Sequence, residues 1–473
     1  MKQILLIIFL GASVSATAQI LSLSFDDALR QMQQGNRSLK IADKGIETAR
    51  TERDKLNALW YPSLQGAGTF VHLSEKIEVK QPLSQFTDPA KDFVHNLVPD
   101  DQFISSILDQ IGSHTLASHT LAFPLAPRNL STVGLTAEWI VFSGGKRIRA
   151  GKIGNAMIDI ARENREQTDA TQRVLLAESY FGLRLAQEVV RVRQDTYNSL
   201  KRHYENALKL EAAGMIDKAG RLFAQVNMDE AQRSLEASQK ETAVLQNALR
   251  TLLNITTCSI QPVSPLFINA VLPAKEEFLQ TMQTENYTVN QLQLQSHIAK
   301  QQLRIEQSGY LPDIAVFGKQ TLYAHGIQSN LVPRTMIGVG FTWNLFDGLA
   351  REKRIRQSKI AQQTLSIGQE KAKDDLSVGI DKLYTQMQKA QDNVRALNTT
   401  IELSEELVRI RKKSFTEGMA TSTEVIDSET MLATVRVARL AAYYEYDVAL
   451  MNLLALCGTP EEFGKLSNLR VEN

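Results

Sequence analysis

The sequence predicts a mainly α-helical protein with a smaller set of β-strands, built as two tandem β-β-α-α repeats. Three observations predict this fold class: an internal repeat, apolar and polar residues that alternate ahead of each helical stretch, and a proline-free helical run over 145–214. A single offset of 204 residues superimposes the helical stretches of both copies without a gap. It aligns Trp139 with Trp343, Phe142 with Phe346, Tyr180 with Tyr384, Gly214 with Gly418 and Leu252 with Leu456. A repeat of this length indicates an architecture rather than a local similarity.

The start of the chain predicts export. One lysine, an apolar run over 4–10 and the cleavage signal Ala16-Thr17-Ala18 are typical of a signal peptide, here residues 1–18. No other window is long and apolar enough for a membrane-spanning helix, which leaves a soluble protein or a β-barrel. The net charge of +1 lacks the basic surface of a nucleic-acid binder, and no nucleic acid is expected as a partner.

The repeats divide the mature chain into ordered segments. Repeat 1 spans 19–254 and repeat 2 spans 274–457, with a linker over 255–273 and a C-terminal tail over 458–473. Repeat 1 is expected to contain an N-terminal helix over about 25–59, strands over 60–73 and 131–142 around a long extracellular insert, 74–130, and a helical hairpin over 145–254. Repeat 2 is expected to contain a helix over 274–309, strands over 311–323 and 335–346, and a helical hairpin over 348–457.

The second strand of each repeat alternates most clearly. Apolar residues occupy one face and glycine, threonine, asparagine or glutamate the other over 132–142 and 337–345. About ten such residues suit a strand that crosses lipid in a barrel with a wet interior, with Trp139 and Trp343 near the membrane interface. An ordinary soluble sheet with one buried face has the same period. Because four strands cannot close a barrel, the membrane alternative requires an oligomer.

The helical segments have matching lengths. Over 174–207 the apolar stripe repeats about every 3.67 residues, which favours nearly straight helices that can line a tube. The descending helix should reach roughly 100 Å and the returning helix over 216–253 only about 57 Å. Stacking the segment 274–309 above the returning helix 216–253 restores the missing length, and Phe25 to Leu59 is expected to pair in the same way with the returning helix Thr423 to Cys457 of the second copy. Cys258 and Cys457 could form a bridge or remain free.

These features together resemble the TolC family of outer-membrane efflux and secretion channels. The resemblance rests on the twofold strand-strand-helix-helix order, the strand exits 141–145 and 345–348, and the turns at Gly214 and Gly418. It implies a homotrimer in which each subunit gives four strands to one twelve-stranded membrane β-barrel, continued by a long periplasmic α-helical barrel. It also implies the cell outer membrane as location, with a periplasmic helical domain.

The resemblance implies a periplasmic gate. The family carries acidic residues six and nine positions after the turn glycine of the second repeat, where this chain has Glu424 and Asp427. Three copies of each carboxylate around one axis would repel one another and favour cations. The alternative is structural, because Thr421 to Glu424 has the spacing of a capping box. Well-known members carry a basic residue two positions after that glycine, whereas this chain has Ala420, so the closing interactions are expected to differ.

Two further sets of residues are candidate contact sites. The apolar hairpin tips are expected to meet a periplasmic adaptor and comprise Gly214, Met215, Ile216, Gly418, Met419 and Ala420. Basic residues recur at matched positions after both strand exits: Arg147, Arg149, Lys152, Arg351, Lys353 and Arg356. Because cations oppose the dipole at a helix N-terminus, we expect these residues to contact outer-membrane phospholipid head groups. A simply solvated face is the alternative.

No enzyme chemistry is expected. The chain lacks a complete P-loop, a nucleophile elbow and a zincin motif, and its histidines lack convincing metal-ligand spacing, so neither a metal nor a cofactor is predicted. The sequence therefore predicts a passive outer-membrane exit channel of a tripartite efflux or type I secretion system. Its expected partners are a periplasmic adaptor (membrane fusion) protein and, through it, an inner-membrane pump of the RND or ABC type. The alternative is a trimeric periplasmic or surface structural stalk.

Overall fold

The computed structural model describes residues 20–74, 77–79, 123–126, 128–256, 258–326 and 333–467. They fall into two compact units. The helical unit contains residues 1–50, 156–297 and 362–473, and the strand unit contains residues 51–155 and 298–361. The predicted signal peptide, most of the insert 74–130 and the end of the tail lie outside the described residues.

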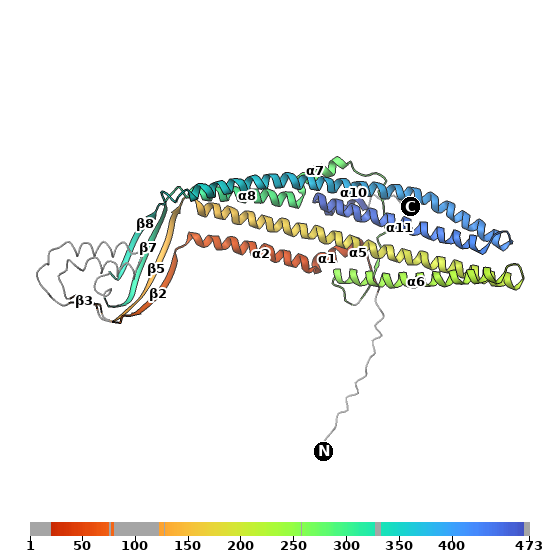
Figure 1. Cartoon of the computed structure of the whole chain (residues 1–473), viewed down its shortest axis with the longest axis horizontal. Coiled ribbons are helices and arrows are strands. Elements are labelled where there is room, and N and C mark those ends of the chain that lie inside the picture. The colour runs from red at the N-terminus through yellow and green to blue at the C-terminus, as the bar shows by residue number, and fades with distance from the viewer. Residues whose placement is uncertain are drawn as a thin grey trace, which may run out of the picture. The chain divides into compact units, whose positions relative to one another are not determined.

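The predicted fold class of two tandem β-β-α-α repeats is confirmed (Figure 1). The four long strands are β2 (Ser63–His72), β5 (Asn129–Ser143), β7 (Asp313–His325) and β8 (Thr335–Thr342). They form one antiparallel sheet in the order β2-β5-β7-β8, so the pairing of β5 with β7 joins the two repeats. The short strands β3 (Ile77–Val79) and β4 (Phe123–Ala126) pair separately.

The strand predicted over 335–346 ends earlier than expected. Its last residue is Thr342, which pairs with Asp313, the first residue of β7. Pro312 precedes Asp313 and has no backbone N–H to donate, so Trp343 and the residues after it have no strand partner. The apolar alternation that predicted the strand therefore continues into the loop that leads to the next helix.

The apolar side chains of the sheet are not buried within one chain. Among the described residues of β2, β5, β7 and β8, no apolar side chain belongs to the buried core. Ile337 is 82% exposed and Phe341 is 74% exposed. A soluble sheet would bury one of its faces, whereas a large exposed apolar face marks a surface that is covered by something else.

Each repeat has one long helical hairpin. The first consists of α5 (Lys146–Ala212) and α6 (Lys218–Leu252), and the second of α10 (Ala350–Thr416) and α11 (Ser422–Cys457). Within the described residues, no helix combines the length and the apolar composition needed to cross a membrane.

The helices predicted over about 25–59 and 274–309 are both broken, which corrects the expectation of one continuous helix in each place. The predicted stacking is also wrong, because each segment stacks on the returning helix of its own repeat: Gly35 lies against Asn254, just after α6, and the side-chain amide of Asn286 donates to the carbonyl of Leu456 in α11 at 2.7 Å. The observed elements are α1 (Phe25–Gly35), α2 (Arg37–Asn57) and the 3-10 turn η1 (Ala58–Trp60), and α7 (Lys275–Glu285) and α8 (Tyr287–Ser308). Asn36 and Asn286 interrupt them with extended backbone angles. Each asparagine oxygen then accepts a hydrogen bond from an N–H of the next helix, which restarts it as an N-cap.

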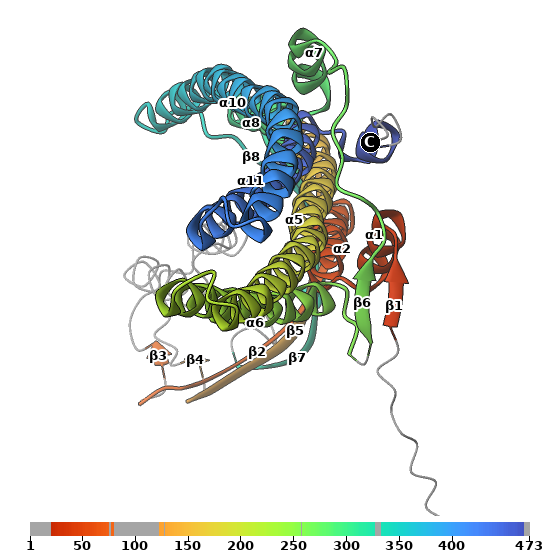
Figure 2. The ribbon, with the colours of Figure 1, turned by 90° about the vertical axis from the view of Figure 1, so that its right-hand side faces the viewer.

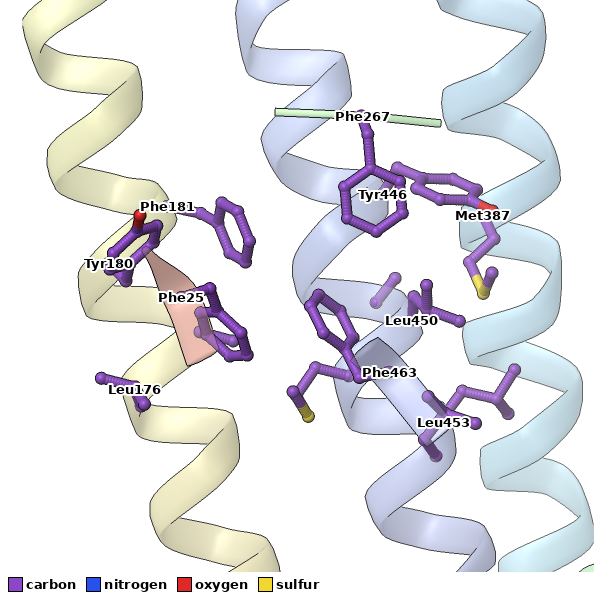
Figure 3. Close-up of a cluster of buried hydrophobic side chains, with 14 of the residues drawn as sticks. Phe25, Leu176, Tyr180, Phe181, Phe267, Met387, Tyr446, Leu450, Leu453 and Phe463 are labelled. Atoms are coloured by element: carbon purple, nitrogen blue, oxygen red, sulfur yellow. The ribbon is translucent and has the colours of Figure 1, made fainter. Parts of the chain in front are cut away.

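The core of the helical unit gathers segments that are distant in the sequence. Phe25 from α1 stacks on Phe181 from α5 at 5.2 Å and meets Phe463 from the C-terminal tail at 5.1 Å (Figure 3). Strand β1 (Ile20–Leu23) pairs in parallel with β6 (Ser259–Pro262), and Figure 2 shows them side by side. The predicted linker 255–273 therefore contains a strand, and the predicted tail contains the ordered elements η3 (Pro460–Glu462) and α12 (Phe463–Ser467).

Candidate functional site

The two hairpin turns share one backbone geometry. Gly214 and Gly418 have φ angles of 70° and 75°, in the left-handed region that glycine adopts without strain. The next residue of each turn donates its N–H five residues back, from Met215 to Leu210 and from Met419 to Ser414, both at 2.8 Å. This pattern is the Schellman motif, which ends a helix tightly. Glycine at these positions is therefore required by the turn.

The apolar residues of the tips divide into an exposed and a buried group. Met215 and Met419 are 57% and 72% exposed. Ile216 and Ala420 instead pack against a small tip core of Ala207, Ala224, Phe415 and Val425. Of the predicted adaptor contacts, the two methionines are therefore accessible, whereas the isoleucine and the alanine hold the tips together.

Glu424 forms the capping box that the sequence allowed. Its carboxylate accepts a hydrogen bond from the backbone N–H of Thr421 at 2.8 Å and an ion pair from Arg411 at 2.9 Å. The backbone hydrogen bond from Thr421 is the largest cause that lowers the pKa of Glu424, and the charge of Arg411 lowers it further. Asp427 lies about one turn further along α11 and is exposed. The structure therefore gives Glu424 a structural role, which does not by itself test a gate.

An ion pair braces each hairpin close to its turn. Arg411 in α10 meets Glu424 in α11, and Glu211 in α5 meets Arg221 in α6 at 3.1 Å. The charges are reversed between the two hairpins. In the second hairpin, where the turn is followed by Ala420, the cation of the pair comes from the preceding helix.

A buried polar network joins the two hairpins above their tips. Ser199 and His203 on α5 face Lys412 on α10 and Ser422 and Glu429 on α11. The imidazole Nε2 of His203 lies 2.7 Å from the hydroxyl of Ser422, and the ammonium of Lys412 donates to Ser199 at 2.6 Å. Ser199 and Lys412 both contact the carboxylate of Glu429. Burial lowers the pKa of His203 to about 4, so its ring is neutral at pH 7.

This network was not predicted from the sequence. Its signal was present, because the repeat offset places Leu403 and Leu407 where the first copy has Ser199 and His203. A position that is polar in one copy and apolar at the aligned place in the other indicates a contact that only one copy makes. Comparison of the two copies position by position would have identified both residues.

Two of the arginines predicted to contact lipid bind backbone carbonyls of their own chain, one of them buried and the other partly buried. Arg351 is 7% exposed, and its guanidinium donates to the carbonyls of Gly309 at 2.8 Å and Asn344 at 3.1 Å. It also stacks over the ring of Tyr310 at 3.9 Å. Arg147 repeats the arrangement at the other strand exit, where it donates to the carbonyl of Leu59 at 3.1 Å and stacks over Trp60 at 4.5 Å. These contacts compensate the unfavourable helix dipole without lipid.

The other predicted interface residues remain at the surface of the strand unit. Arg149 donates to the side chain of Gln301 at 3.3 Å, whereas Lys152, Lys353 and Arg356 are exposed. Trp139 and Trp343 are 42% and 51% exposed. Their ring N–H groups donate to the carbonyls of Trp60 and Tyr310 at 3.0 and 3.1 Å. Each tryptophan is thus fixed by its polar end, and its apolar ring faces outward.

Comparison with known proteins agrees with this geometry. Residues 278–459 match the family described as outer membrane efflux protein. No curated protein gives a significant sequence match to the chain. Among solved structures, the chain is similar to CusC, with 16% identity, 92% of each chain covered and a TM-score of 0.71. It is also similar to VceC of Vibrio cholerae, with 14% identity, 92% of this chain and 96% of VceC covered, and a TM-score of 0.68.

The open state of the outer-membrane channel MtrE of Neisseria gonorrhoeae is a third similar structure. It shares 16% identity, with 92% of this chain and 89% of MtrE covered and a TM-score of 0.67. At this level of identity the three structures support the fold over the 92% of the chain that each of them covers. The family and these structures are outer-membrane proteins and channels rather than enzymes.

Proposed function

We propose that this chain, whose residues 278–459 match the outer membrane efflux protein family, is the outer-membrane exit channel of a tripartite efflux or type I secretion system. It would conduct substrates passively from a periplasmic adaptor and an inner-membrane pump of the RND or ABC type to the exterior. The observation that carries this proposal is the four-stranded sheet whose apolar side chains stay exposed in the single chain. Lipid on one side of such a sheet would remove that surface from water.

A homotrimer supports this function better than a monomer. Strands β2 and β8 are the two edges of the sheet, and each edge leaves backbone N–H and C=O groups for another strand. Three copies joined edge to edge would give a twelve-stranded barrel with no free edge. In such a barrel Trp139 and Trp343, and the exposed Lys152, Lys353 and Arg356, would meet the outer-membrane interface.

The periplasmic gate is proposed at Glu424 and Asp427 of the three subunits. Asp427 is the exposed carboxylate of the pair, and Glu424 carries the ion pair with Arg411 that braces the hairpin. In this proposal Asp427 contributes most of the cation preference, and the bracing of Glu424 keeps the tip narrow. The exposed Met215 and Met419 are the residues that an adaptor helix would contact.

Single-channel conductance in planar bilayers tests both the channel and the gate. The Glu424→Ala, Asp427→Ala double variant should conduct more and lose cation selectivity, because both rings of charge are removed. Arg411→Ala should raise conductance but keep selectivity, since the brace is lost and the carboxylates remain. Glu417→Ala, an exposed acidic residue beside the same turn, is the control and should match wild type.

The stalk alternative gives a different result. Folded trimers that never insert or conduct would contradict the channel and favour a structural stalk. A conductance that the double variant leaves unchanged would keep the channel and refute the acidic gate.

A further inference from the structure

A cavity of about 430 Å³ lies at the joint between two helices of the first repeat. Its walls come from the break between α1 and α2, from α5, and from the last turn of α6 with the residues that follow it. Lining side chains include Arg37, Ser38, Gln172, Arg250 and Thr251. A volume of this size suits a small-molecule ligand.

The cavity is positively charged and contains no acid. Arg37 and Arg250 line it, and none of the lining residues is an aspartate or a glutamate. Among the residues that the structure describes, neither arginine has a carboxylate within ion-pair distance. The Nε of Arg250 is buried and has no hydrogen-bond partner there, while one of its Nη atoms donates to the carbonyl of Thr256. Arg37 is exposed to solvent, whereas Arg250 is partly buried and has a buried donor without a partner, so an anion in the cavity would satisfy Arg250 first.

The backbone N–H groups at the start of α2 do not need an anion. The side-chain oxygen of Asn36 already accepts hydrogen bonds from the N–H groups of Ser38 and Leu39, at 2.7 and 3.3 Å. The amide nitrogen of Asn36 donates to Gln172 at 2.7 Å. The helix end is therefore capped within the chain, and the unpaired charge belongs to the two guanidinium groups.

The second repeat has a different chemistry at the matched joint. Alignment of Asn36 with Asn286 places Tyr287 opposite Arg37, and the repeat offset places Leu454 opposite Arg250. Leu454 is 1% exposed in the core, and the hydroxyl of Tyr287 donates to the carbonyl of Gly458 at 3.2 Å. The second repeat forms the matched joint with uncharged residues at these two positions. The two arginines are therefore not needed to form the joint of the first repeat.

We propose that this cavity binds a small anionic ligand that carries a phosphate or a carboxylate group, held between Arg37 and Arg250. The planar guanidinium groups match both oxyanions, and the hydroxyl of Ser38 adds a neutral donor, whereas that of Thr251 already donates to the carbonyl of Asn247 at 2.9 Å. Because Arg37 begins α2 and Arg250 lies in the last turn of α6, the bound anion connects the ends of these two helices. Its binding stabilises this joint of the first repeat by mass action.

Calorimetric titration of the purified full-length protein tests the proposal with two probes, inorganic phosphate and citrate, against chloride at equal ionic strength. Wild type should bind at least one probe. Arg250→Leu and, separately, Arg37→Tyr should each weaken binding roughly tenfold or more, which corresponds to the loss of one charged hydrogen-bond partner. Both variants carry the residue that the second repeat has at the matched position. Arg233→Leu, an exposed arginine on the same helix α6, is the control and should bind as wild type does.

The results distinguish a phosphate ligand, a carboxylate ligand and the absence of an anion site. Binding of phosphate alone assigns a phosphate ligand, and binding of citrate alone assigns a carboxylate ligand. Absence of binding of both probes to wild type overturns the proposal, as does binding that Arg37→Tyr and Arg250→Leu leave at the level of Arg233→Leu. Circular dichroism melting of each variant verifies that it is folded. Channel conductance is a separate measurement, so a negative result here leaves the proposed channel intact.

Discussion

Each repeat passes from its second strand into a long helix through an arginine that stacks on an aromatic ring and binds backbone carbonyls. Arg147 over Trp60 and Arg351 over Tyr310 are the two versions of this strand exit. The joints between stacked helices, by contrast, differ: Asn254 faces Gly35 in the first repeat, whereas Gly458 faces Glu285 in the second. At the strand exits, where several backbone carbonyls need a hydrogen-bond donor, both repeats use an arginine. At the helix joints, where two backbone segments only pack closely, the two repeats use different residue pairs.

The helix joints offer the largest expected effect. Gly458 has a φ angle of 89°, and a Cβ there would lie 2.2 Å from the carbonyl oxygen of Glu285. Gly458→Asn should therefore destabilise the fold by roughly 4 kcal/mol or more, because the clash is with backbone. Asn is the residue that the first repeat accepts at the matched position, where Asn254 has a φ angle of 55°.

Thermal unfolding followed by circular dichroism measures this difference. Asn254→Gly, the reverse exchange in the first repeat, is the control and should change stability by less than about 1 kcal/mol. Equal losses of stability in Gly458→Asn and Asn254→Gly would contradict the difference in packing between the two joints.

The strand exits provide the second test. Arg351→Ala should cost roughly 3 kcal/mol, since it removes a buried guanidinium and leaves the carbonyls of Gly309 and Asn344 without their donor. Arg147→Ala should cost less, because Arg147 is only partly buried and solvent can replace its contacts. Chemical denaturation of both variants is the measurement. A larger loss in Arg147→Ala would contradict the ranking, and Arg356→Ala on the exposed surface is the matched control.

The buried network between the hairpins predicts a dependence on pH that only the first copy supplies. The unfolded chain protonates His203 near pH 6.5, whereas burial lowers the folded pKa to about 4. The folded state therefore loses stability as the pH falls through 6.5 and reaches the full loss, at most about 3 kcal/mol, below pH 4. The nearby charge of Glu429 opposes this shift, and that of Lys412 adds to it.

Hydrogen exchange of the amides around His203 measures this loss directly. Protection in wild type should fall between pH 6.5 and pH 4 after correction for the intrinsic exchange rate. His203→Gln cannot titrate there, so its profile should be flatter by the same amount. Parallel profiles in the two proteins would exclude His203 as the titrating group.

The ion pairs at the tips should give the smallest effect. Arg221→Ala and Arg411→Ala should each cost less than about 1 kcal/mol, since surface ion pairs contribute little. Arg221 should matter more, because its pair with Glu211 is less exposed than that of Arg411 with Glu424. Melting temperatures at low salt and at about 1 M salt test this, and the difference between each variant and wild type should shrink at high salt.

Much of the fold could be predicted from the sequence. The resemblance to the TolC family and the two tandem repeats are confirmed, since periodicity and an internal offset are properties of the chain itself. The breaks at Asn36 and Asn286 were missed because the apolar pattern continues through them. The pairing of β1 with β6 was missed because two four-residue strands have too few residues for a recognisable period.

The candidate site was predictable in position but not in contacts. The turn glycines and the two methionines lie at exposed tips, as their spacing indicated. The roles of Arg147 and Arg351 could not be read in advance, because a basic residue after a strand looks the same whether it reaches lipid or its own backbone. Glu424 fitted both a gate and a capping box; the geometry shows the capping box, and the gate stays a prediction.

The sequence by itself determined the repeat, the alternating strands, the helix lengths and the glycine turns, because each depends on neighbours within a few residues or on one fixed offset. Only the tertiary structure decided which charges are satisfied. Arg351 binds carbonyls of its own chain, His203 contacts Ser422 between the two hairpins and Lys412 contacts Glu429 within the second, and Arg37 and Arg250 line one cavity without an acidic residue. Such pairings depend on which side chains meet in space, and free energy of a buried charge is set by its partners rather than by its place in the chain.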